Sequence, residues 1–148
     1  MKWLLGNVDR EFVDGEVQQA VKDIVGKSGE LNSREWYELA LSCIDLTTLN
    51  STDNHTQAEK FALRVTGFKD EFPGLPNVAA ICVYPTLVEP VKKNLHVPQV
   101  KLASVCAGFP SSQTYLEVKV LETKMAIDKG ASEIDIVLNL GNFLDKDY

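Results

Sequence analysis

Hydrophobic positions follow two different patterns along the chain. In its first third, apolar residues recur three or four positions apart, which is the period of an amphipathic helix. One helix is expected over residues 15–25. A second helix is expected to open where Asn32 and Glu35 stand three positions apart, the spacing of a capping box. We therefore predict that residues 1–43 form a helical extension.

The rest of the chain, residues 44–148, alternates short apolar runs with helical stretches. An order of strand, helix and strand predicts parallel strands that are joined by right-handed crossovers. The runs recur about every 30 residues, close to the roughly 31 that each unit of a (β/α)₈ barrel occupies. The expected strands cover residues 43–47, 78–83, 100–106 and 133–138, and the expected helices cover 54–66, 85–95 and 114–130.

Local signals mark where these helices begin. Asp53 or Asn54 is expected to cap the helix over residues 54–66. Thr114 and Glu117 have capping-box spacing before the last helix. A Gly-Phe-Pro segment that contains Phe109 has the composition of a strand-to-helix turn, which could line the mouth of a pocket.

The alternation of polar and apolar residues within the strands distinguishes two α/β architectures. Ile134 and Ile136 fall on one face of their strand and Asp135 falls on the other. Asp45 and Thr47 likewise share a face of the first strand. A doubly wound sheet buries both faces and has nearly continuous apolar strands. Carboxylates on one consistent face therefore favour the lumen of a barrel, here with about four parallel strands and three crossover helices.

Charge and cysteine content exclude several classes of protein. Lys plus Arg is 15 and Asp plus Glu is 21, giving a net charge of −6. The acidic composition, with no basic patch in the sequence, argues against nucleic acid and anionic membranes as partners. The three cysteines are widely spaced and no His, Asp or Cys pair has metal-ligand spacing, so no metal or other cofactor is expected. Apolar surroundings of the cysteines favour reduced thiols and a cytoplasmic protein.

Asp135 is the candidate with the strongest claim to chemistry. An unpaired carboxylate that is buried within an apolar strand costs several kcal/mol, so it requires a partner or a function. It could serve as a general acid or base, or orient a lysine. Alternatively, it could accept hydrogen bonds from a neighbouring strand or loop.

Three further residues have weaker claims. Asp45 and Thr47 could bind substrate hydroxyls or a water, or could merely end a strand or cap a turn. Cys82 lies in an apolar strand with no basic neighbour in sequence, so it is more typical of an inert buried thiol than of a nucleophile.

Several segments together resemble the deoxyribose-phosphate aldolase family. The resemblance covers roughly residues 40–148 and is specific because separate segments occur in the same order and spacing. Its motifs lie within residues 44–50, 79–85 and 108–141. The first 40 residues are similar to a variable N-terminal extension and contribute little.

The resemblance implies a metal-independent (β/α)₈ barrel. Such an enzyme reversibly cleaves 2-deoxy-D-ribose 5-phosphate to D-glyceraldehyde 3-phosphate and acetaldehyde through a lysine Schiff base, in deoxyribonucleotide catabolism. By this resemblance, Asp135 matches the aspartate that acts with lysines in proton transfer. Asp45 and Thr47 match substrate-facing residues, and Cys82 matches a cysteine near the pocket.

The lysine that such a reaction needs has no evident match here. Lys101 alone falls in an expected strand, at its start, which is the wrong end of a barrel for chemistry. The resemblance places the Schiff-base lysine on strand 6, its partner on strand 7 and the phosphate site after the last strands. We therefore expect the chain to be the N-terminal half of an aldolase barrel, inactive alone.

Two other interpretations remain. A half barrel has open strand edges, so it is expected to pair with the missing half or with a second copy of itself. It could then be a non-catalytic structural or binding module that self-associates. A flavodoxin-like domain would need a fifth strand, for which no residues remain.

Overall fold

A computed structural model describes residues 13–147 of the chain. The part of the predicted helical extension in residues 1–12 lies outside this range. The chain divides into two compact parts, one that ends at Tyr37 and one formed by residues 38–148, and each is described by itself.

The first part contains the first predicted helix. Helix α2 (Asp14–Gly26) is followed by a 3₁₀ turn, η1 (Ser28–Leu31). The apolar residues of α2 follow helical spacing, yet all of them are exposed, with Ile24 71% accessible. The second predicted helix is also confirmed, as α3 (Arg34–Ser42).

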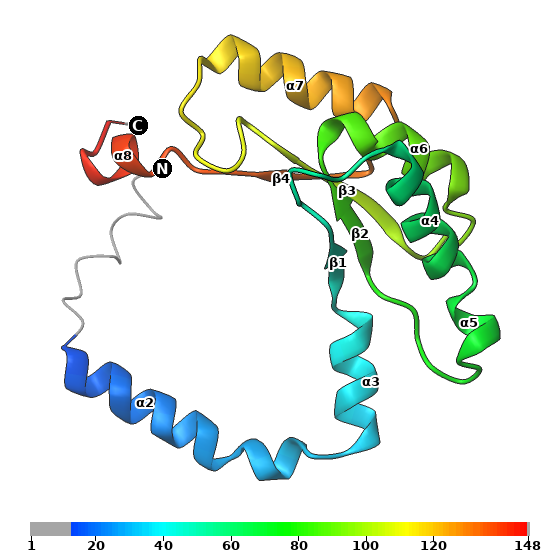
Figure 1. Ribbon diagram of the computed structural model, residues 1–148. Helices are drawn as coiled ribbons and strands as arrows, with labels where there is room; N and C mark the ends of the chain where they lie inside the picture. The colour runs from blue at the N-terminus through cyan, green and yellow to red at the C-terminus, as the bar shows by residue number, and fades with distance from the viewer. Residues whose placement is uncertain (1–12, 148) are drawn as a thin grey trace. The chain divides into compact units, whose positions relative to one another are not determined.

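The second part is built on a four-stranded parallel sheet in the order β1-β2-β3-β4 (Figure 1). Each expected strand is present, although each is one or two residues shorter than the apolar run that predicted it. The strands are β1 (Asp45–Thr47), β2 (Ala80–Val83), β3 (Lys101–Cys106) and β4 (Glu133–Ile136).

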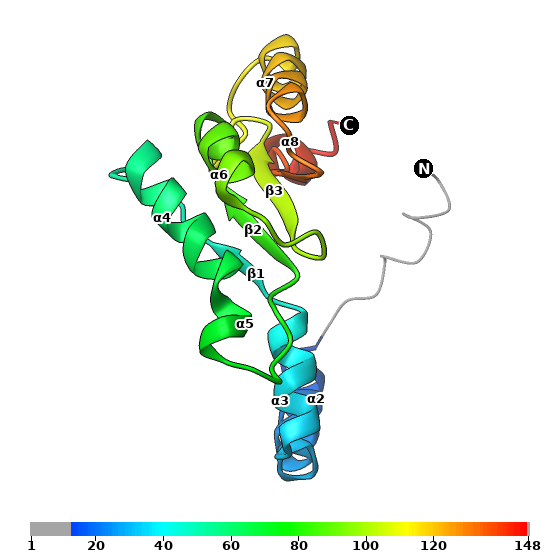
Figure 2. The ribbon, with the colours of Figure 1, turned by 90° about the vertical axis from the view of Figure 1, so that its right-hand side faces the viewer.

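Three crossovers connect the strands, as the repeat predicted. Their main helices, α4, α6 and α7, pack on one face of the sheet, and Figure 2 shows α4 beside α6. Two short helices, α5 and α8, were not anticipated. The helical segments are α4 (His55–Thr66), α5 (Phe68–Glu71), η2 (Pro85–Leu87), α6 (Val88–Asn94), α7 (Leu116–Asp128) and α8 (Leu140–Leu144).

One predicted helix cap is confirmed and another is wrong. Asn54 caps α4 in a capping box, since its side chain accepts from the Gln57 amide at 3.1 Å and Gln57 returns the interaction. Helix α7 instead begins at Leu116 without any side-chain cap. Thr114 belongs to the preceding loop, where its methyl group lies only 2.8 Å from the point where a Cβ on Gly108 would stand.

The main core lies between the sheet and its helices. Ile81 and Val83 of β2 are fully buried there against Val88 and Val91 of α6. Burying each such side chain contributes about 1.5–3 kcal/mol. Leu46 and Ile134 are partly buried against the same core, so alternate positions of all four strands point toward the helices.

The opposite face of the sheet carries a second, smaller apolar cluster, formed by Ala80, Cys82, Ala103 and Val105. The partly buried side chains that pack against it come from loops at the carboxyl ends of the strands rather than from helices. They are Leu49, Tyr84 and Phe109. We call this side of the sheet the open face.

Candidate active site

The strand register brings the candidate residues onto the open face. Thr47 of β1 pairs with Cys82 of β2, which pairs with Ala103 of β3. Two residues further along, Val105 of β3 pairs with Asp135 of β4. Because side chains alternate along a strand, Asp135 projects to the same side as Cys82. The candidate residues thus share one face of the sheet, as the alternation predicted.

Cys82 lies close enough to both candidate carboxylates for their charges to act on its thiol. Burial raises the pKa of its thiol, and the nearby carboxylates of Asp135 and Asp45 raise it further because they disfavour a second negative charge. Hydrogen bonding from Thr47 opposes these effects only in part. The thiol is therefore protonated near neutral pH, which disfavours a nucleophilic role and suits a wall of a pocket.

The two candidate carboxylates differ from the sequence expectation in their burial. Asp45 and Asp135 are exposed, as is Thr47. Their charges remain solvated and need no buried partner here. The Thr47 hydroxyl donates to the Asp45 carbonyl oxygen at 2.8 Å, a local bond that orients this side chain.

The loop after β1 is held by a carboxylate with a different function. Asp53 accepts from the Thr48 hydroxyl at 2.7 Å and from the Asn50 amide at 3.0 Å. The Thr48 bond is the main reason why the pKa of Asp53 lies below its usual value. Asp53 was one of two predicted caps for the helix that follows, whereas its side chain closes the turn that carries Leu49.

Tyr84, which sequence analysis did not single out, links the loops at the carboxyl ends of the strands. Its hydroxyl donates to the Leu49 carbonyl oxygen at 3.1 Å. Its ring meets Phe109 edge to face, with centroids 6.0 Å apart. Tyr84 follows Cys82 by two residues, so strand alternation alone could have placed it on this face. The Gly-Phe-Pro turn does lie beside this apolar cluster.

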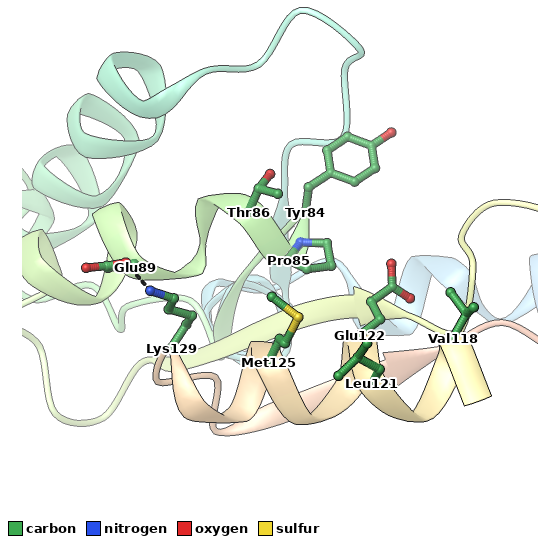
Figure 3. Close-up of a pocket in the computed structure, with 9 residues that line it drawn as sticks. All are labelled: Tyr84, Pro85, Thr86, Glu89, Val118, Leu121, Glu122, Met125 and Lys129. Carbon is green, nitrogen blue, oxygen red and sulfur yellow. Dashed lines mark hydrogen bonds and ion pairs between the residues drawn. The ribbon is translucent and has the colours of Figure 1, made fainter. Parts of the chain in front are cut away.

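Two surface grooves lie elsewhere, along the two sides of α7. One, of about 670 Å³, lies between η2 and α7 and is shown in Figure 3. The other, of about 660 Å³, lies between α7 and the segment that follows β4. Asp45, Thr47, Cys82 and Asp135 line neither of these grooves.

No lysine of the described residues stands at the carboxyl end of a strand. Lys101 is the one lysine in a strand, and it is the first residue of β3. Lys119 of α7 donates to the Ser112 hydroxyl, and Lys129, after α7, pairs with Glu89. Residues 13–147 thus supply acids, a hydroxyl and a thiol to the open face, but no amine at its carboxyl end.

The described residues contain no group of three or more His, Cys, Asp or Glu side chains that could hold a metal ion. All three cysteines are free thiols. Within residues 13–147, no helix combines the length and the apolar character needed to cross a membrane.

Comparison with known proteins gives these features a context. No protein-family model matches the chain. A Caenorhabditis elegans protein with a provisional deoxyribose-phosphate aldolase name is 34% identical over 143 residues, which span 95% of this chain and 47% of the relative. Human deoxyribose-phosphate aldolase is 33% identical over 114 residues, 70% of this chain and 36% of that protein.

Solved structures agree with the sequence matches. The tetrameric deoxyribose phosphate aldolase from Aeropyrum pernix matches with a TM-score of 0.57 and 25% identity. The match covers 70% of this chain and 41% of that one. Four parallel strands with helices on one face are therefore the α/β arrangement found in the barrels of these aldolases.

The fold and the sequence matches together show the α/β fold of the (β/α)₈-barrel aldolases. Over the part of the chain that the matches cover, it belongs to the deoxyribose-phosphate aldolase family. The chain spans less than half the length of each of these three proteins.

Proposed function

We propose that this chain contributes one side of a deoxyribose-phosphate aldolase site. The reaction is the reversible cleavage of 2-deoxy-D-ribose 5-phosphate to D-glyceraldehyde 3-phosphate and acetaldehyde. The observation that carries the proposal is the convergence of Asp135, Asp45 and Thr47 around Cys82 on the open face. The family membership supplies the chemistry that such a face would serve.

Each residue has a proposed role that fits its surroundings. Asp135 is exposed on the open face, where its carboxyl group would exchange a proton with the substrate and orient an ammonium group or water. Asp45 and Thr47 lie in β1, beside the strand that carries Cys82, and would bind substrate hydroxyls. Cys82 remains protonated and presents a small apolar wall to the substrate.

The covalent step needs an amine that residues 13–147 do not place at the site. Schiff-base formation requires a lysine whose pKa is lowered by desolvation or by a neighbouring cation. We propose that this lysine, together with the phosphate-binding loops, belongs to polypeptide other than these 148 residues. On this proposal the 148-residue chain alone does not form the imine.

We further propose that the sheet is completed by the remaining barrel strands or by a second copy of the chain. The unpaired edge of β4 is followed by exposed apolar side chains, including Leu138 and Leu144, and Ile136 within β4 is 69% accessible. These exposures also favour the second candidate function, a non-catalytic half barrel that self-associates. A covering partner would remove this apolar surface from water.

Borohydride trapping with acetaldehyde tests the function. The full chain should give no stoichiometric lysine adduct by itself. Mixed with the part of the Caenorhabditis relative that it does not match, it should give an adduct on a lysine of that part and cleave the sugar phosphate. In the same mixture, Asp135→Asn should lower cleavage, while Asp128→Asn on α7 serves as the matched control.

The outcomes separate the two candidate functions. A stoichiometric adduct on the isolated chain would overturn the proposed origin of the lysine. A mixture that associates but never cleaves the sugar phosphate would overturn the aldolase proposal and favour the structural module. Sedimentation of the chain alone reports self-association, for which Ile136→Lys should lower the associated fraction.

A further inference from the structure

The loop between β3 and α7 has an unusual backbone. Gly108 has φ +76°, and the non-glycine residues Ala107 and Ser112 also have positive φ, at 64° and 57°. A left-handed backbone is unfavourable for residues that have a Cβ. Such a conformation persists only where surrounding contacts hold it in place. Two side chains of α7 supply such contacts.

Glu122 and Lys119 hold this loop from the same helix. The Glu122 carboxylate accepts a hydrogen bond from the Gly108 amide at 3.0 Å. One turn earlier on α7, the Lys119 ammonium donates to the Ser112 hydroxyl at 2.7 Å, and Ser112 is fully buried. Both bonds involve a charged side chain, so each is stronger than a bond between neutral groups. Figure 3 shows Glu122 on the side of α7 that faces Pro85 and Tyr84.

The residue that this bond places is Phe109, which directly follows Gly108. Phe109 packs against the cluster on the open face that contains Cys82, and its ring meets Tyr84. Tyr84 in turn donates to the Leu49 carbonyl oxygen. Leu49, Tyr84 and Phe109 thus form a continuous apolar cover from β1 to β3, which we call the roof. Beneath it, Cys82 is only 3% accessible.

We propose that Glu122 is a positioning residue for the site on the open face. Its hydrogen bond to the Gly108 amide sets the backbone that carries Phe109, and Phe109 completes the roof over Cys82. Glu122 itself does not reach the open face, since its carboxylate ends at the loop backbone. The inference rests on the proposed function only in treating the open face as a substrate site.

This role requires a hydrogen-bond acceptor at position 122, which glutamine provides and alanine does not. The Gly108 amide needs an acceptor at the end of a side chain of this length. Glutamine keeps a carbonyl oxygen there and loses only the charge, whereas alanine leaves the amide without this partner. Rescue by glutamine therefore distinguishes a hydrogen-bonding role from a role in the overall charge of α7.

Hydrogen exchange and thiol labelling of the full chain test the proposal. In a Cys43→Ser background, which removes the exposed thiol, Glu122→Ala should speed exchange of the Gly108 amide about tenfold or more. It should also speed alkylation of Cys82 by iodoacetamide, located by peptide mass analysis. Glu122→Gln should fall much nearer to wild type, and Glu117→Ala, an exposed glutamate of the same helix, should change neither rate.

A second variant separates the roof from the bond that holds it. Phe109→Leu should speed Cys82 alkylation while leaving Gly108 exchange unchanged, and it serves even if Glu122→Ala does not fold. The proposal is overturned if Glu122→Ala and Glu122→Gln both behave as wild type, or if Phe109→Leu leaves Cys82 labelling unchanged. None of these readouts uses aldolase activity. If borohydride trapping gives no adduct, the exchange and labelling results still test the role of Glu122.

Discussion

Val105 of β3 and Asp135 of β4 are direct register partners in the parallel sheet. Val105 is buried in the cluster that contains Cys82, whereas Asp135 is exposed at the last strand of the sheet. The pairing therefore brings a solvated carboxylate close enough to a buried thiol to act on its pKa. The strand pairing thus brings together Asp135 and Cys82, two candidate residues that lie 53 positions apart in the sequence.

The first prediction concerns this charge. Asp135→Asn should lower the pKa of the Cys82 thiol, because it removes a negative charge that disfavours the thiolate. The midpoint of the rate of Cys82 alkylation against pH, measured in the Cys43→Ser background, should move to lower pH. Asp128→Asn on α7 should leave it in place. A midpoint that moves upward or stays fixed in Asp135→Asn would contradict the proximity of the two groups.

Two glycines whose φ angles have opposite signs give the second prediction. Gly108→Ala should destabilise the fold by about 1–3 kcal/mol, because φ is +76° and the added Cβ would meet the Thr114 methyl group at 2.8 Å. Gly67→Ala should be neutral or stabilise by about 0.4–1 kcal/mol, because φ is −83° and the Cβ has room. Urea unfolding measures both. Equal losses of unfolding free energy in the two variants would contradict the positive φ of Gly108.

The capping box of α4 gives the third prediction. Asn54→Ala should cost about 1 kcal/mol of unfolding free energy, because the Gln57 amide loses its acceptor at the helix terminus. Asn54→Ser should recover most of that loss, since serine is also a good cap. Ser51→Ala, an exposed position in the preceding turn, should stay within about 0.5 kcal/mol of wild type. A similar loss in Ser51→Ala would point to the turn rather than to the cap.

The fourth prediction concerns acid stability. Glu89 accepts from Lys129 at 2.8 Å and from Lys93 at 2.9 Å, which lowers its pKa from 4.5 to about 2. The ion pairs therefore stabilise the folded state fully above about pH 4.5, and this contribution is lost as the pH falls toward 2. Because the group is exposed, the effect should be small and should weaken in high salt.

Urea unfolding between pH 2 and 7 checks this acid contribution. Glu89→Gln should flatten the pH dependence in that window. Lys129→Ala should flatten it more than Lys93→Ala, because the Lys129 bond is the larger cause of the lowered pKa. A Glu89→Gln variant whose stability still falls as steeply as wild type would assign the acid sensitivity to other carboxylates.

Much of the second part of the chain was predictable because its signals are local. Two-residue alternation in the strand around Asp135 and the helical spacing after it depend only on backbone geometry, which each short segment carries with it. Asn54 as a helix cap was predictable for the same reason. The Thr114 prediction was wrong because the packing of its methyl group against Gly108 competes with the local motif.

The amino-acid sequence by itself determined the order of helices and strands and the face of each strand on which Asp45, Thr47, Cys82 and Asp135 lie. Only the tertiary structure decided which strands are neighbours and in what register, and therefore that two carboxylates raise the pKa of one thiol. It also decided that Glu122 reaches the Gly108 amide. Periodicity acts within a few residues, whereas register and loop contacts join segments that become neighbours only when the sheet assembles and buries its apolar face.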